Sequence, residues 1–392
     1  MKTAFLTVAV LFAAIGIRAD FNAQVPDVIT DFPCPRPDPM TPDPTLRCVM
    51  SVLDNPRGLA FGPEGALYVA EAGRGGFELE NPFCFTGTLG AIRCYGATGA
   101  VSRLWQGAQQ RVVTGLPSQA NTLGRMANGP DHIAMLGLGT ASLTIGLFQP
   151  VAIRDAYPEL GGLGWLARFE PSGEWRFVAD LAAYEAANNP DGGTIDSNPY
   201  GLIAMPDRHV LTDASGNSLL QVDANGNIST LAVFQSRHSD PPRSTDAVPT
   251  SVAIGPDGAY YVGELSGAPY VVGAANVYRV VPGESPRLFR PEDACLGGFT
   301  FVVDIAFDPQ GNLYVLQYGS SAGLAGQGLL IRVTPDASQP GDICAQYRAG
   351  TRTTIVEGLF QPTAVAIGPD GALYISNYGN YPHDGQVVRV TQ

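Results

Sequence analysis

The sequence predicts an all-β protein built from repeated antiparallel units, and three observations lead to this fold class. A hairpin motif, Gly-Pro-(Asp/Glu)-Gly-Ala-x-Tyr-(Val/Ile), occurs at residues 62–69 and 368–375, with a close copy at 255–262. Similar apolar strands precede the copies and recur elsewhere in the chain. The last unit lacks one strand, and a suitable strand lies ahead of the first unit. Internal repetition of this kind is typical of solenoids and propellers.

Each copy of the motif encodes a β-hairpin together with its turn. Small and apolar residues before the turn, such as Gly58–Phe61 and Ser251–Ile254, suit a strand that is buried on both faces. Pro followed by Asp/Glu-Gly reverses the chain, because Pro presets the backbone angle and Gly tolerates positive φ. The β-forming residues after the turn predict a second strand. In the third unit, Ser218–Val222 and Ile228–Val233 complete a four-stranded antiparallel sheet.

Six such units can be aligned along the chain. Their first strands begin at Pro56, Pro130, Pro199, Pro249, Val302 and Pro362. The second unit is degenerate, because Gly137-Leu138-Gly139 replaces the usual turn. Repeats of roughly 40 to 60 residues with four strands each predict a six-bladed β-propeller of four-stranded antiparallel blades.

The two ends of the chain bear directly on this prediction. The last unit stops after its third strand, Gln386–Val390, while Met50–Leu53 lies just ahead of the first unit. We expect this N-terminal strand to complete the last blade, because closing the ring removes an open sheet edge. An open array with frayed ends is the alternative.

The N-terminal region and the composition predict a secreted or periplasmic monomer. Residues 1–19 have the charged start and apolar stretch of a signal peptide, which is too short for a membrane span. Residues 20–47 form a Pro-rich extended arm, and residues 48–392 a single propeller domain. The net charge of -13 argues against nucleic acid and anionic membranes as partners.

The six cysteines predict disulfides, because an exported chain meets an oxidising environment. Cys84 and Cys94 share one long insertion of the first unit, and we expect them to pair. The other four allow three pairings: Cys34, Cys48, Cys295 and Cys344. No pair has the Cys-x-x-Cys spacing of a zinc or redox site.

Four segments resemble the ScyD/ScyE family of exported proteins. They are Asn55–Phe61, Tyr68–Gly76, Val113–Ser118 and Val262–Gly267. The resemblance extends from about Asn55 to Val390 and implies a six-bladed propeller of NHL/gluconolactonase-like architecture. The family takes its name from a pathway to scytonemin, an aromatic pigment, and its resemblance supplies no catalytic residues.

The starts of the first strands and the ends of the second strands should emerge on one face of the propeller, around its channel. We call this side the funnel face. The candidate ligand-binding residues there are Asn55, Arg57, Asn198, Tyr200, Thr250, Gln317 and Asn377. Glu71, Asp213 and Glu264 are candidate ligands of Ca²⁺ or another divalent cation, because converging carboxylates repel one another without a cation or proton between them. Alternatively, each carboxylate caps a strand end or accepts backbone hydrogen bonds.

His132 is the candidate catalytic side chain, because it occupies a channel-lining position that is small in other units. A histidine there could act as a general base or a metal ligand. Asp131 beside it and Asp304 in the fifth unit could orient or charge it. The alternative is a histidine that plugs the channel.

Long insertions should also gather on the funnel face, where loops on a rigid scaffold usually form the binding surface. They comprise residues 73–98, 181–197, 266–275, 319–328 and 380–384, and Leu181–Ala187 should be helical. Aromatic side chains on these loops could stack on a planar or sugar-like ligand, although several should pack the loops onto the blades.

Three classes of function remain. The first, which we favour, is an exported binding or accessory protein that holds a small molecule or a protein partner at the loop-rich face. The second is a metal-dependent hydrolase or lactonase, although Asn55–Gly58 supplies no glutamate where enzymes of the gluconolactonase type have a ligand. The third is a structural interaction scaffold. Motifs of serine hydrolases, phosphate-binding loops and zinc proteases are not apparent in the sequence.

Overall fold

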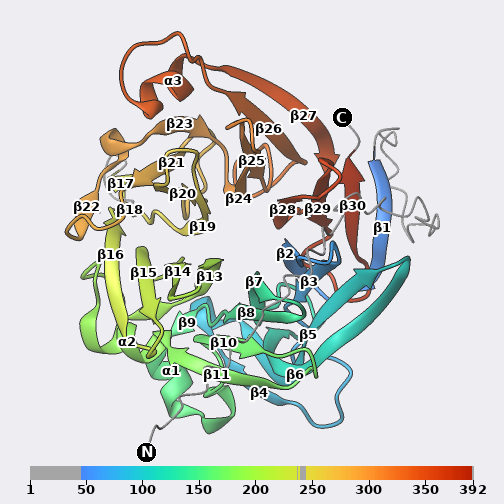
Figure 1. The fold of residues 1–392 in the computed structure, drawn as a ribbon. Helices are drawn as coiled ribbons and strands as arrows, with labels where there is room; N and C mark the ends of the chain where they lie inside the picture. Colours follow the sequence, from blue (N-terminus) through green and yellow to red (C-terminus); the bar gives the residue numbers. More distant parts are fainter. Residues whose placement is uncertain (1–45, 236, 239–243, 391–392) are drawn as a thin grey trace, which may run out of the picture.

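The structure is a computed structural model that describes residues 46–390 except 236 and 239–243. Six antiparallel sheets of four or five strands stand around a central axis (Figure 1), so the predicted six-bladed β-propeller is confirmed. The predicted signal peptide, almost all of the predicted arm and Cys34 lie outside the described residues.

The strands of each blade follow one another outward from the axis. Blade 1 contains β2 (Pro56–Phe61), β3 (Leu67–Glu71), β5 (Ile92–Trp105) and β6 (Ala108–Asn121), with β4 (Phe83–Thr86) paired to β5. Blade 2 contains β7 (Pro130–Gly137), β8 (Thr140–Ile145), β10 (Trp165–Phe169) and β11 (Trp175–Asp180). Blade 3 contains β13 (Pro199–Ala204), β14 (Arg208–Asp213), β15 (Ser218–Asp223) and β16 (Ile228–Phe234).

The second half of the ring repeats this order. Blade 4 contains β19 (Pro249–Ile254), β20 (Tyr260–Glu264), β21 (Ala275–Val280) and β23 (Leu296–Phe299). Blade 5 contains β24 (Val302–Phe307), β25 (Leu313–Gln317), β26 (Gly328–Thr334) and β27 (Thr351–Leu359). Blade 6 contains β28 (Ala364–Ile367), β29 (Leu373–Asn377), β30 (Gly385–Val390) and β1 (Leu46–Leu53).

Short elements decorate the connections between the blades. Two-residue strands pair as β9 (Gln149–Pro150) with β12 (Asp196–Ser197), and as β17 (Arg237–His238) with β18 (Ser244–Thr245). The helices are α1 (Val151–Ala156), α2 (Leu181–Asn188) and α3 (Ile343–Ala349). Helix α2 confirms the helix expected in this insertion, and it ends at Asn189 with a left-handed φ of 39°. Among the described residues, no helix has the length and apolarity needed to cross a membrane.

The N-terminal strand closes the ring as the sequence predicts. Strand β1 pairs antiparallel with β30, from Leu46 opposite Val390 to Leu53 opposite Gly385. The first and last parts of the described chain therefore lie side by side in blade 6 (Figure 1). This pairing covers the edge that β30 would otherwise expose.

Small residues let the innermost strands approach one another around the axis. A Cβ added to Gly58 of β2 would lie 2.7 Å from the Cα of His132 on β7. A Cβ added to Gly201 of β13 would lie 2.8 Å from the Cα of Ser251 on β19. The glycines in these strands are thus required by backbone contact between blades rather than by a turn.

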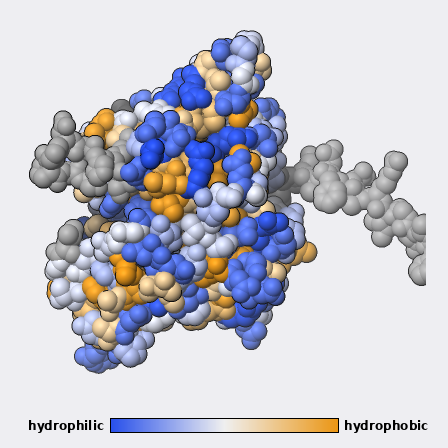
Figure 2. Space-filling view, turned by 90° about the vertical axis from the view of Figure 1, so that its left-hand side faces the viewer, coloured by the Kyte–Doolittle hydropathy of each residue, from blue (hydrophilic) through white to orange (hydrophobic). Residues whose placement is uncertain are grey.

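Two additional links join neighbouring blades. Strand β22 (Arg287–Phe289), from the connection within blade 4, pairs in parallel with β16 and adds a fifth strand to blade 3. The Cys295–Cys344 disulfide joins the segment before β23 to α3 of blade 5, and the predicted Cys84–Cys94 disulfide is confirmed. Figure 2 looks onto the outer side of the ring near β22, where hydrophobic patches are separated by hydrophilic side chains.

Candidate functional site

The side chains at the ends of the second strands share one structural contact in four blades. Each accepts a hydrogen bond from a backbone N–H just before the first strand of its own blade. The N–H groups of Asp54, Asn198 and Phe360 donate to Glu71 (2.7 Å), Asp213 (2.7 Å) and Asn377 (2.8 Å), and Thr300 N–H donates to Gln317. A carboxylate and an amide oxygen serve equally here, because each only has to accept a hydrogen bond.

The candidate metal ligands make further contacts within their own blades. Glu71 accepts hydrogen bonds from Ser102 Oγ (2.6 Å) and from the Arg111 guanidinium (2.6 Å), which also contacts Asp54. Asp213 accepts from Ser197 Oγ (2.5 Å) and from the N–H of Gly216 (2.9 Å). Glu264 accepts a hydrogen bond from the Tyr278 hydroxyl at 3.3 Å.

The three candidate metal ligands end strands of blades 1, 3 and 4, and the structure does not bring them together. Across the described part of the chain, no group of three or more His, Cys, Asp or Glu side chains is arranged to hold a metal ion. The hydrogen bonds of Glu71 and Asp213 agree with the alternative expected from the sequence, in which each carboxylate caps a strand end or accepts backbone hydrogen bonds. A divalent cation at the funnel face stays a prediction.

The candidate catalytic residues do meet at the axis. Nε2 of His132 on β7 lies 3.9 Å from Oδ1 of Asp304 on β24, and the His132 side chain is 15% exposed. Asp304 is held in place because its Oδ2 accepts the N–H of Val365 on β28 at 2.9 Å. Nδ1 of His132 is buried and has no hydrogen-bond partner among the described residues.

Arg57 at the start of β2 connects three blades at the funnel face. Its guanidinium donates to Oδ1 of Asp131 (3.3 Å), to the carbonyl of Ala127 (2.6 Å) and to Oδ1 of Asn380 (3.1 Å), as well as to the carbonyl of Gly379. Burial raises the pKa of Asp131 to about 7, and the positive charge of Arg57 partly opposes this rise. Asp131 is therefore poised to bind or release a proton near neutral pH.

The remaining predicted ligand-binding residues lie around this centre. Asn55 donates to the carbonyls of Gly73 and Gly124 (both 2.8 Å), and Thr250 donates to the carbonyl of Val302 (2.7 Å). Asn198 Oδ1 accepts the N–H of Leu147 at 3.1 Å. Burial raises the pKa of the Tyr200 hydroxyl, and Arg57, Asp131 and Asp304 act on it electrostatically. Thr250 and Asn198 therefore link neighbouring blades, Asn55 ties together loops of blade 1, and Tyr200 faces the charged centre.

A cavity of about 290 Å³, which the sequence did not predict, lies on the funnel face. Five parts of the chain line it: residues 191–196 after α2, the loop between β14 and β15, the end of β16, Asp246 before β19, and Leu288 of β22. Its lining includes Asp191, Asp196, Ser215, Asn217, Asp246 and Leu288. The sequence did place residues 181–197 on this face, and the close spacing of Asp191 and Asp196 was the available signal.

Carboxylates that repel one another surround this cavity. Burial and the charges of Asp213, Asp246 and Asp191 raise the pKa of Asp196 to about 7. Burial and the charges of Asp213, Asp191 and Asp196 raise the pKa of Glu185, on α2, to about 8. Near neutral pH, these groups are therefore easily neutralised by protons or by a bound cation.

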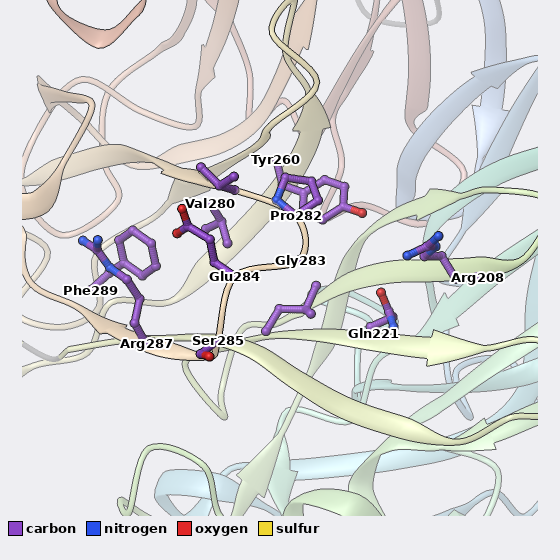
Figure 3. A pocket seen from close by; sticks show the side chains of 12 residues that line it. Arg208, Gln221, Tyr260, Val280, Pro282, Gly283, Glu284, Ser285, Arg287 and Phe289 are labelled. Atoms are coloured by element: carbon purple, nitrogen blue, oxygen red, sulfur yellow. The ribbon is translucent and has the colours of Figure 1, made fainter. Parts of the chain in front are cut away.

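A second cavity lies at the opposite end of blades 3 and 4 and holds only about 30 Å³. Figure 3 shows its lining, where Arg208 and Gln221 of blade 3 face Tyr260 and the chain leading to β22. The Arg287 guanidinium lies over the Phe289 ring, 4.0 Å from its centre. The space suffices for about one water molecule, so this cavity is a packing feature of the junction.

No family model matches the chain, and no curated protein matches it. A catalytically inactive virginiamycin B lyase from Staphylococcus aureus with quinupristin is 12% identical, with a TM-score of 0.44, covering 88% of this chain and 99% of its own. Regucalcin from Agrobacterium tumefaciens, a calcium-binding protein, is 13% identical, with a TM-score of 0.44. The match covers 87% of this chain and 90% of the regucalcin chain. A calcium structure of Trichoderma reesei Carbohydrate-Active Enzymes Family AA12 is 12% identical, with a TM-score of 0.48. The match covers 92% of this chain and 99% of the other chain. At this level of similarity, an activity has to be argued from the residues of this chain.

Proposed function

We propose that this protein is an exported, ScyD/ScyE-like binding protein that holds a small molecule on the funnel face of its propeller. The observation that carries this proposal is the cavity of about 290 Å³ over blade 3. Five separate parts of the chain line it, and two of them are held by the rigid ends of β14 and β16. Loops that enclose a concave space on a rigid scaffold are the usual form of a ligand site.

The size and lining of the cavity support a small ligand. Pockets that bury most of a small molecule usually start at about 300 Å³. Apolar Val233 and Leu288 lie in the same lining as Asp191 and Asn217, so a bound molecule would meet both kinds of surface. This combination fixes the orientation of a ligand as well as its affinity.

A substitution that fills the cavity tests the proposal. Thr194 is exposed and lies in the lining, so Thr194→Trp should occupy the space without disturbing the blades. Ser172→Trp is the matched control, because Ser172 is exposed in the turn between β10 and β11 at the other face. Small molecules screened by thermal shift should stabilise the wild type and the Ser172→Trp variant but not the Thr194→Trp variant. A set of stabilising molecules that acts equally on all three proteins would contradict the proposal.

A divalent-metal-dependent hydrolase with its site at the axis is the second candidate. The approach of His132 to Asp304 supports it, together with the raised pKa of Asp131. A base with a pKa near 7 is suited to proton transfer at neutral pH. Hydrolysis of simple lactones and esters, measured with and without added calcium, tests this candidate. Turnover that His132→Ala abolishes while the fold is retained would favour it over the binding protein.

A further inference from the structure

One wall of the cavity over blade 3 is acidic. Asp191 and Asp196 come from the segment after α2, and Asp246 comes from the chain before β19. Asn217 donates a hydrogen bond from Nδ2 to Oδ2 of Asp191 at 2.8 Å, which fixes one carboxylate at the rim. The three aspartates therefore approach the same space from two separate segments of the chain.

A buried carboxylate stands behind this wall. Glu185 on α2 is only 1% exposed, and its Oε1 has no hydrogen-bond partner among the described residues. A Cβ added to Gly216 would lie 2.9 Å from Oε2 of Glu185 and 3.3 Å from Cγ of Asp213. Gly216 stands between Ser215 and Asn217, which both line the cavity. Glu185 thus places a carboxylate with an unsatisfied oxygen directly behind the loop that lines the cavity, beside the carboxylate of Asp213.

This arrangement favours a proton or a bound cation beside the carboxylates, since an unpaired buried carboxylate is strongly unfavourable. The shape of the site favours an organic cation over a bare metal ion. In the described residues no three ligating side chains close around one point, and the space of about 290 Å³ is far larger than an ion needs. The cavity also has an apolar side, formed by Val233 and by Leu288, which is 46% exposed.

We propose that the cavity over blade 3 binds a small aliphatic amine, with an ammonium group at Asp191, Asp196 and Asp246 and the carbon chain along Val233 and Leu288. An ammonium group donates three hydrogen bonds, which suits carboxylates that approach from different directions. Apolar contact with the chain adds to the affinity and rejects strongly hydrated inorganic ions. This inference rests on the proposed function, because it names the ligand class of the same cavity.

Calorimetry with 1,4-diaminobutane at pH 8 and low salt tests the proposal, with 1,4-butanediol as the neutral molecule of the same shape. We expect the diamine to bind the wild type and the diol to give no heat. Asp196→Asn should weaken diamine binding roughly tenfold or more, because it removes one charged partner. Asp207→Asn should leave the affinity unchanged, because Asp207 is exposed in the turn between β13 and β14 at the opposite face.

Glu185→Gln adds a readout that a merely misfolded variant would not give. Removing this charge should weaken diamine binding and at the same time raise the melting temperature of the free protein at pH 8. Diamine binding that is equal in the wild type and the Asp196→Asn protein would overturn the proposal. Calcium binding that depends on Asp196, without diamine binding, would also overturn it and identify a metal site instead.

The same experiments distinguish failure of this inference from failure of the proposed function. A neutral or anionic molecule that binds the wild type but not the Thr194→Trp variant, with no diamine binding, would refute the amine and leave the ligand cavity standing. If no molecule of any charge distinguishes these two proteins, both proposals fall.

Discussion

His132 and Asp304 meet across the propeller axis, with 3.9 Å between Nε2 and Oδ1, although they belong to blades 2 and 5 on opposite sides of the ring. The channel is narrow enough there for two side chains to span it. Asp304 also accepts the N–H groups of Ile305 (2.9 Å) and Val365 (2.9 Å), so it contributes to the frame of blades 5 and 6 as well.

These two partners should therefore differ in their effect on stability. Asp304→Ala leaves the buried Val365 N–H without its acceptor, and we expect a loss of about 1–3 kcal/mol in the free energy of unfolding. His132→Ala leaves both of those backbone hydrogen bonds in place, so its cost should be smaller. Urea unfolding of the two variants checks this order. A larger loss for His132→Ala would mean that the contact across the axis dominates.

Arg57 should be among the most important polar residues for stability. It is 5% exposed and donates to groups of blades 2 and 6, so Arg57→Leu leaves Asp131 and several carbonyls without their donor. We expect a loss of about 3–5 kcal/mol, as is usual when one partner of a buried ion pair is removed. Adding Asp131→Asn should recover part of this loss, which a double-mutant cycle measures. If the losses in unfolding free energy of the two single variants add exactly in the double variant, Arg57 and Asp131 are not energetically coupled.

The acidic cavity should make stability depend on pH. Glu185 and Asp196 have raised pKa values, to about 8 and about 7, and they face Asp191, Asp213 and Asp246. In the folded protein these two groups keep protons that an unfolded carboxyl releases near pH 4. Their contribution to stability is therefore fully present below about pH 4 and is lost as the pH rises towards 8. The melting temperature should accordingly fall between pH 5 and pH 8, and Glu185→Gln should reduce that fall.

Asp207→Asn is the control for this pH dependence. The Arg208 guanidinium lowers the pKa of Asp207, so its titration affects stability only below about pH 4. The control should show the same fall in melting temperature as the wild type between pH 5 and pH 8. If the melting temperature of the Glu185→Gln variant falls by the same amount, groups other than Glu185 cause the pH dependence.

The two disulfides that lie wholly within the described residues should contribute unequally. Their sequence separations are 10 residues for Cys84–Cys94 and 49 residues for Cys295–Cys344. Chain-entropy arguments give about 3 and about 4 kcal/mol, so replacing Cys295 and Cys344 by Ser should cost about 1 kcal/mol more than replacing the other pair. Thermal unfolding of the two double variants measures the difference. The reverse order would indicate that native contacts in the insertion of blade 1 outweigh the loop entropy.

Repetition made the fold predictable from the sequence. The turn glycines Gly65, Gly258 and Gly371 have φ values of 82°, 77° and 75°, as the motif requires. The same local chemistry repeats around the ring, so each unit supports the assignment of the others. Even the degenerate second unit forms a blade, because β7 and β8 pair without a Pro-Asp-Gly turn.

The candidate site was predictable only in part. Sequence position placed Glu71, Asp213 and Gln317 at equivalent strand ends, and their different side chains suggested different roles. The structure shows that all three accept the same kind of backbone hydrogen bond. A hydrogen-bond acceptor can be a carboxylate or an amide, so chemical difference between repeats did not indicate a functional difference.

The sequence by itself determined the six blades, the closure by β1 and the Cys84–Cys94 pair, because these depend on local turn chemistry, on the repeat and on residues close together in the chain. Only the tertiary structure decided the Cys295–Cys344 pair, the contact of His132 with Asp304 and the cavity where Glu185 and Asp196 approach Asp246. Those features join segments that are distant in sequence, and their distances depend on how blades and loops pack in three dimensions.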